Sequence, residues 1–142
     1  MNLPDKEKFL FNFSLCANWE EKYLYLIELG GKLLPLPVGM HTQEHLIAGC
    51  QSQVWIVLKE DTYNYVQLYG DSDSAIVKGM IATVFILYNG LSLAGILSYN
   101  VQPFFETIAL SQHLTPSRAL GLEAIVRSIR VKAATWHQPI SS

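Results

Sequence analysis

Residues 54–88, VWIVLKEDTYNYVQLYGDSDSAIVKGMIATVFILY, decide the fold that the sequence predicts. In the first part apolar and polar side chains alternate, which is typical of a strand with one buried face. Residues 60–62 are polar and predict a turn, and residues 65–69 alternate again, so the two strands should form an antiparallel hairpin. Residues 74–88 are apolar nearly all round, which predicts a helix buried at the centre of the domain.

Two helices are expected before the hairpin. The first should extend from residue 4 or 5 to residue 17, because proline and acidic side chains suit its first turn. Asn18 is a good cap for the second helix, and Gly30 with the next glycine should end that helix in a left-handed conformation. Residues 33–49 hold two prolines and two glycines, which predicts irregular structure with a short edge strand near Leu33.

The helical pattern returns after the hairpin. Asp73 is the expected cap of the central helix, and short helical segments should follow at 92–97 and 103–110. The final helix should begin with Thr115 as its cap and Pro116 at its first position. Its buried stripe should consist of Ala119, Leu122, Ile125, Val126 and Ile129.

Composition limits the class of protein. Half of the 142 residues are hydrophobic, but the longest apolar stretch is only half of the ~20 residues that a membrane span needs. The net charge of -2 is spread along the chain without a basic cluster, which argues against nucleic acid as a partner. The first eight residues lack the layout of a secretory signal, so we expect a cytoplasmic protein.

Together these elements predict one α+β domain over residues 1–142, with a loose tail at about 136–142. A small antiparallel sheet should pack on one side against several helices. Whether the chain forms a homodimer is left open.

Cys50 is the strongest candidate for a chemical role. It follows Gly49 where an irregular polar segment becomes the first strand, and loops on rigid scaffolds often carry reactive groups. Cys16 lies in an apolar helical pattern, where a thiol mostly packs, so we assign it to the core. His41 and His45 stand four residues apart and would join Cys50 in a metal site only if their segment were helical; solvated loop histidines are the better interpretation.

Four segments follow one another in the order of a known family: residues 16–26 (CANWEEKYLYL), 49–55 (GCQSQVW), 70–79 (GDSDSAIVKG) and 112–118 (QHLTPSR). They resemble the SufE family, the sulfur-acceptor partners of cysteine desulfurases. The resemblance extends from about residue 4 to about residue 134, and the segments are nearer to SufE than to the similar CsdE branch.

The resemblance implies that Cys50 receives sulfur from the persulfide of a SufS-like cysteine desulfurase, becomes a persulfide, and passes the sulfur to an iron–sulfur scaffold. It implies an accessory protein that stimulates the desulfurase, not an independent enzyme. No cofactor or metal is implied here, because pyridoxal phosphate belongs to the desulfurase. The implied fold is one that iron–sulfur scaffold proteins share. Gly49 and Gln51 flank the thiol, and Asp73 is implied to lie near this cysteine loop.

Arg118 is the second candidate, because a cation in the first turn of a helix opposes the helix dipole. One interpretation is an ion pair with Asp71 or Asp73. The other is that Arg118 and the helix N-terminus stabilise a thiolate or persulfide anion, and the two are compatible. Trp55 and His113 are candidates for the surroundings of the same site, although packing alone accounts for both.

Two alternative functions stay open. An iron–sulfur cluster scaffold needs about three clustered thiolates, and the chain has two cysteines. A cysteine hydrolase needs a base beside Cys50. His41, His45 and His113 are available, but no recognised spacing ties any of them to the thiol.

Overall fold

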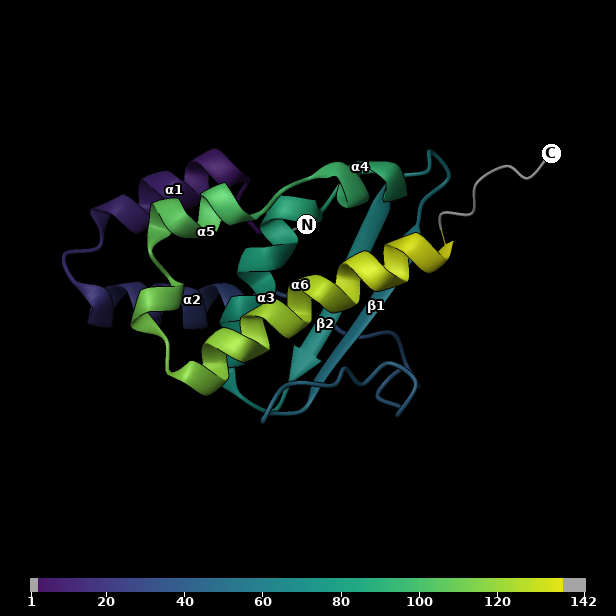
Figure 1. The fold of residues 1–142 in the computed structure, drawn as a ribbon, viewed down its shortest axis with the longest axis horizontal. Coiled ribbons are helices and arrows are strands. Elements are labelled where there is room, and N and C mark those ends of the chain that lie inside the picture. Colours follow the sequence, from purple (N-terminus) through teal and green to yellow (C-terminus); the bar gives the residue numbers. More distant parts are fainter. Residues whose placement is uncertain (1–2, 137–142) are drawn as a thin grey trace.

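The computed structural model describes residues 3–136, which form six α-helices, one 3₁₀ helix and a two-stranded antiparallel sheet (Figure 1). The predicted α+β class is confirmed. Of the tail expected at 136–142, Trp136 belongs to the last helix and the rest lies outside the described residues. The elements are α1 (Lys6–Leu15), α2 (Trp19–Gly30), β1 (Val54–Glu60), β2 (Val66–Ser72), α3 (Ala75–Tyr88), α4 (Leu93–Ser98), α5 (Gln102–Ile108), η1 (Ser111–His113) and α6 (Pro116–Trp136).

The hairpin forms as the alternating pattern predicts. Val54 pairs with Ser72 at one end and Glu60 with Val66 at the other. One face of the hairpin, which includes Ile56 and Gly70, is buried. Helix α3 lies so close to this face that a Cβ on Gly70 would collide with side chains of the helix. This face packs against the helices, as expected of a small sheet covered on one side.

The edge strand expected near Leu33 is wrong, since no residue from 31 to 40 joins a strand or bridge. Pairing at this edge occurs later, where Leu46 bridges Trp55. The backbone N–H of Ile47 donates to the carbonyl of Val54 at 2.9 Å. The prolines that follow Leu33 explain the difference, because proline cannot donate to a strand ladder.

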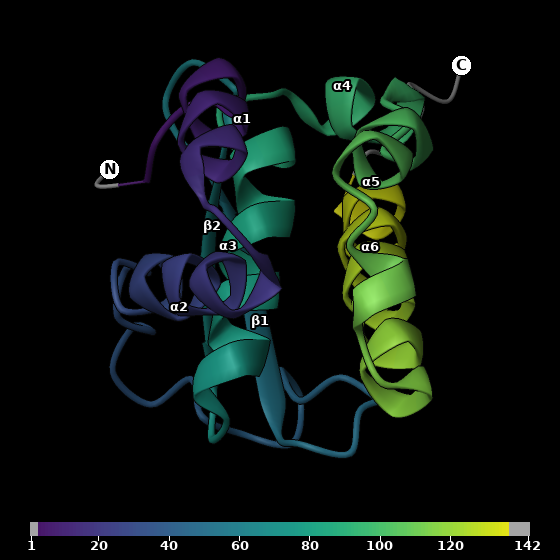
Figure 2. The same ribbon diagram turned by 90° about the vertical axis from the view of Figure 1, so that its left-hand side faces the viewer.

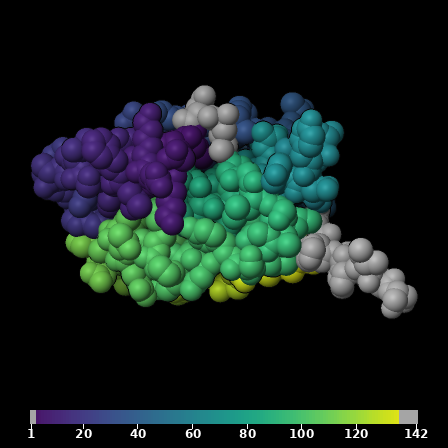
Figure 3. All heavy atoms as spheres, turned by 90° about the horizontal axis from the view of Figure 1, so that it is seen from above, coloured from purple at the N-terminus to yellow at the C-terminus, as the bar shows by residue number. Residues whose placement is uncertain are grey.

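The central helix α3 separates two groups of helices. Figure 2 shows α1 and α2 on one side of it and α4, α5 and α6 on the other. From Met80 to Tyr88 every residue of α3 is buried, which confirms the predicted central helix. Seen from above, α1 and α2 (purple) and the hairpin turn (teal) lie at opposite ends of the molecule (Figure 3). None of the described helices is long and apolar enough to cross a membrane.

Helices α2 and α3 cross at two glycines. A Cβ on Gly79 would lie 2.4 Å from the carbonyl oxygen of Leu26, and one on Gly30 would lie 2.7 Å from the backbone nitrogen of Gly79. The left-handed end predicted for α2 is wrong, because the capping residue Gly31 has a φ of -68°. Gly30 serves the contact with α3, and neither glycine reverses the chain in a left-handed conformation.

Helix α1 ends earlier than predicted, and this changes the position of Cys16. Asn18 adopts an extended conformation and its side chain accepts from the backbone N–H of Glu21 at 2.9 Å, which confirms it as the cap of α2. The preceding helix must therefore stop first, and Cys16 becomes its C-cap. Its thiol is only partly buried and contacts the carbonyl oxygen of Asn12 at 3.6 Å, so assignment to the core is wrong.

Candidate functional site

Cys50 lies between the loop that precedes β1 and the first turns of α6. Its Sγ is 3.8 Å from the carbonyl oxygen of Gly121, and a Cβ on that glycine would lie 3.7 Å from the sulfur. Both spacings are ordinary van der Waals contact, so the thiol packs against the helix at Gly121. Gly121 is not among the residues predicted from the sequence to form the site.

The thiol opens onto a cavity of about 320 Å³. Its walls come from the cysteine loop, from α3 and from the start of α6, and most carry small polar or aliphatic side chains. The lining residues are Cys50, Gln51, Ser52, Ser74, Val77, Met80, Thr115, Ser117, Arg118 and Gly121. Three segments far apart in the sequence therefore meet at Cys50.

Burial raises the pKa of the Cys50 thiol above its ordinary value. No cation acts strongly enough to offset this in the resting structure, so the thiol form is favoured at neutral pH. Cys50 is thus held as a thiol, half-buried beside a space that can admit another atom.

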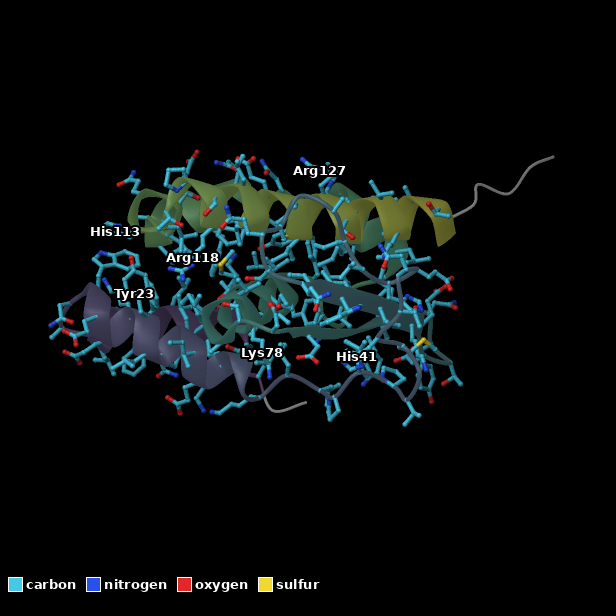
Figure 4. All side chains as sticks on the ribbon, turned by 90° about the horizontal axis from the view of Figure 1, so that it is seen from below. Tyr23, His41, Lys78, His113, Arg118 and Arg127 are labelled. Carbon is cyan, nitrogen blue, oxygen red and sulfur yellow. The ribbon has the colours of Figure 1, made fainter. Side chains whose placement is uncertain are left out.

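Arg118 lines the same cavity. Thr115 caps α6, as predicted, because its hydroxyl accepts from the backbone N–H of Arg118 at 3.3 Å. Among residues 3–136 no carboxylate lies within ion-pair distance of the Arg118 guanidinium. Figure 4 shows its side chain on the side of α6 that faces α2 and α3. The ion pair considered with Asp71 or Asp73 does not form.

The two aspartates are engaged elsewhere. Asp71 contacts His41 at 2.7 Å and Lys78 at 3.8 Å. Burial acts to raise the pKa of its carboxyl group, but hydrogen bonds from His41 and the backbone N–H of Ser72, with the nearby Lys78, outweigh it and the pKa is lowered. Asp73 accepts a hydrogen bond from the backbone N–H of Gln53 at 3.1 Å and donates its own N–H to the carbonyl of Gln53 at 3.4 Å.

Asp73 is not the cap of α3, and that prediction is corrected. Ser74 takes this position, with its hydroxyl accepting from the N–H of Val77 at 3.4 Å. The carboxylate of Asp73 is therefore free to bind Gln53, just before β1. This contact joins the end of the cysteine loop to the start of α3. The place of Asp73 near that loop agrees with what the family resemblance implies.

Gly49 gives the loop its shape. Its φ of +91° lies in the region that L side chains rarely adopt. A Cβ there would also lie 3.1 Å from that of Ala124 and 3.8 Å from the guanidinium of Arg127. Any other residue at this position would push the loop away from α6 and move Cys50.

Trp55 and His113 do not line the Cys50 cavity. Trp55 packs its ring edge-on to His41, with centroids 4.9 Å apart. His113 stacks on Trp19, with centroids 3.8 Å apart, and its carbonyl accepts from the Tyr23 hydroxyl. These contacts join the loop to the sheet and η1 to α2, so packing accounts for both rings.

No imidazole lines the cavity that holds Cys50, in the part of the chain that the structure describes. His41 is bound to Asp71, and His45 faces another hollow beside β1. Cys16 caps α1 and is absent from the cavity wall. Within residues 3–136 no group of three His, Cys, Asp or Glu side chains is arranged to hold a metal ion. Among the described residues that line the cavity, the arrangement offers one thiol and one arginine without an ion pair, and no imidazole or carboxylate that could act as a base.

Comparison with known proteins agrees with this geometry. Residues 7–133 match the family model described as SufE, an Fe-S metabolism associated domain. A similar solved structure is the solution structure of a hypothetical protein from Thermus thermophilus, with a TM-score of 0.73 and 22% sequence identity. The match covers 92% of this chain and 93% of that chain, and at this identity it shows the shared fold.

Proposed function

The chain belongs to the SufE family, whose domain is associated with iron–sulfur metabolism, and from this premise we propose that Cys50 accepts sulfur from the persulfide of a cysteine desulfurase. The sulfur then passes to the machinery that assembles iron–sulfur clusters. By emptying the persulfide of the desulfurase, the protein stimulates that enzyme. Pyridoxal phosphate acts in the desulfurase and not here.

The transfer exchanges one sulfur–sulfur bond for another. The Cys50 thiolate attacks the outer sulfur of the partner's persulfide, and the inner sulfur leaves as a cysteine thiolate, which takes up the proton that Cys50 gave to solvent. One bond forms as one breaks, so no oxidant or reductant is needed. Cys50 then carries the outer sulfur as its own persulfide.

The observation that supports this proposal is the position of the thiol at the wall of a cavity that no imidazole of residues 3–136 lines. A hydrolase would need a base beside the nucleophile. A scaffold would need further thiolates, and Cys16 lies outside the cavity wall. A sulfur acceptor needs a thiol and room for one more sulfur atom, and the cavity of about 320 Å³ supplies the room.

Arg118 supports the same function. A persulfide is more acidic than a thiol and is an anion at neutral pH, whereas the resting thiol has a raised pKa. The unpaired guanidinium of Arg118 and the backbone N–H groups at the start of α6 would stabilise this anion. The negative charge of the persulfide, which appears on Cys50 after the transfer, would thus lie next to the positive charge of Arg118.

Intact-mass spectrometry tests the proposal. The protein is incubated with a cysteine desulfurase, pyridoxal phosphate and cysteine, and then examined without a reducing agent. Added sulfur is expected on the wild type and on Cys16→Ser, and none on Cys50→Ser. Cys16→Ser is the matched control, because it removes the other thiol.

Sulfur that persists on Cys50→Ser would overturn the assignment. So would unmodified wild type beside a desulfurase that still releases sulfide.

A further inference from the structure

A second hollow lies along α6, between that helix and the α4–α5 segment. It consists of a cavity of about 550 Å³ and an adjoining one of about 320 Å³, which share Leu97, Val101, Val126 and Arg130. We call the pair the α6–α4 cavity. Phe105, Leu122, Val131 and Ala134 extend its apolar wall. Its size and lining are those of small-molecule sites, and the Cys50 cavity shares none of these residues.

The deep end of this cavity holds a hydroxyl whose proton has no acceptor. Tyr88 is fully buried, and its Oη has no partner in ordinary hydrogen-bond geometry among residues 3–136, although the Arg130 guanidinium is near enough to act on the oxygen as a donor. Burial raises the pKa of Tyr88, and the nearby Arg130 offsets only part of the rise, so the hydroxyl stays a donor at neutral pH. A buried polar group without a partner destabilises a fold, which makes such groups rare and worth explaining.

A cation stands beside this hydroxyl. Arg130 donates from Nη1 to the carbonyls of Ile96 and Tyr99, at 3.2 and 3.1 Å, and from Nη2 to that of Leu97 at 2.9 Å. These bonds use three of the five N–H donors of a guanidinium and fix it at the end of α4. Its charge meets no carboxylate within ion-pair distance in the described residues.

The wall of the larger cavity carries two further charges. Arg127 and Glu123 both line it and both are exposed, so with Arg130 the charged side chains leave an excess of one positive charge. Figure 4 places Arg127 on the other side of α6 from Arg118. The cavity therefore combines an apolar wall, a fixed cation, a spare hydroxyl donor and a net positive charge.

We propose that the α6–α4 cavity binds a small monocarboxylate with an apolar body, whose carboxylate lies against both the Tyr88 hydroxyl and the Arg130 guanidinium. The hydroxyl donates to one carboxylate oxygen, and the free N–H donors of Arg130 reach the other. The apolar body lies along Leu97, Val101 and Val126. This site is separate from sulfur transfer, and it stands or falls without the role of Cys50.

Calorimetric titration of the full chain with three probes of one length tests the head group. Octanoate should bind saturably. Octanol, which keeps the chain and loses the charge, should bind about tenfold more weakly, because hydrogen bonds to a charged group are the stronger kind. Octylammonium should not bind. Equal affinity for all three, or heat without saturation, would show mere partition into apolar surface and overturn the proposal.

Variants locate the site. Tyr88→Phe removes only this hydroxyl, so the protein should fold and the preference for octanoate over octanol should largely disappear. Val131→Phe places a ring at an exposed position of the cavity wall and should weaken octanoate binding at least tenfold. Leu120→Phe is the matched control, because Leu120 is an exposed apolar residue of α6 outside the wall.

Cys50→Ser should bind octanoate like the wild type. Loss of binding in Cys50→Ser or Leu120→Phe, or unchanged preference in Tyr88→Phe, would place the probe elsewhere and contradict the site.

Discussion

The Cys50 cavity and the α6–α4 cavity both lie along α6, and each contains a weak acid and an arginine. The two arginines are held differently. Each cavity holds a weak acid whose pKa is raised by burial, the half-buried Cys50 in one and the fully buried Tyr88 in the other. Each also holds an arginine of α6 that no carboxylate pairs, within the described part of the chain. Arg118 is exposed and its guanidinium forms no hydrogen bond with the described residues, whereas three carbonyls fix Arg130.

This difference separates a transient charge from a permanent one. A guanidinium held only by its own stem can follow an anion that appears during a reaction. A guanidinium fixed by carbonyls offers an unchanging site, and its removal takes one donor from each of those carbonyls. The two arginines should therefore respond differently to the same substitution.

The largest expected effect is on stability at Arg130. Arg130→Met keeps much of the aliphatic stem but removes three charge-assisted hydrogen bonds from the end of α4, so unfolding free energy should fall by about 3 kcal/mol. Arg118→Met should change it by less than about 0.5 kcal/mol, as is usual for an exposed side chain. Urea denaturation measures both, and equal losses would show that the two arginines are alike.

A smaller effect is expected on sulfur transfer at Arg118. Arg118→Met should slow the appearance of persulfide on Cys50 about tenfold, because one charge-assisted interaction with the anion is lost. Arg118→Lys should restore part of the rate. Arg127→Met is the control, since Arg127 is also an exposed arginine of α6 but lies outside the Cys50 cavity. Quenched mass spectrometry gives the rates, and a normal rate in Arg118→Met would make this residue a bystander.

Local chemistry made most of the fold predictable. The caps at Asn18 and Thr115 follow from short polar side chains before helical patterns, and both are confirmed. The errors arise where tertiary contact overrides local preference. Gly30 resembles a helix end but serves a crossing with Gly79, and no pattern within one helix reports its partner.

The nucleophile of the site could be predicted from the sequence better than the residues that line the cavity. Cys50 and Arg118 come together because the loop and the start of α6 meet, as the sequence-based prediction expects. Asp73 was misread because Ser74 is an equally good cap, and the choice depends on the hydrogen bond from the distant Gln53. The α6–α4 cavity had no sequence signal, since Tyr88 reads as one more apolar residue of a buried helix.

The smallest expected effect is the pH dependence that Cys50 gives to stability. Burial raises the pKa of this thiol in the folded protein, so the folded state holds the proton more tightly than the unfolded chain does. The stabilisation is complete below the unfolded pKa of about 8.5 and disappears as pH rises through the folded pKa. In a Cys16→Ser background, unfolding free energy should therefore decline as pH rises above about 8. Adding Cys50→Ser should flatten part of that decline, and the iodoacetamide reaction of Cys50 should have its midpoint above that of a free thiol. Tyr88→Phe should leave the same pH window unchanged, because its hydroxyl titrates higher.

If the decline is equal with and without Cys50, the thiol is not desolvated at rest. Arg118 would then not be needed to stabilise an anion in this cavity, and the two arginines would differ only in their effect on unfolding free energy.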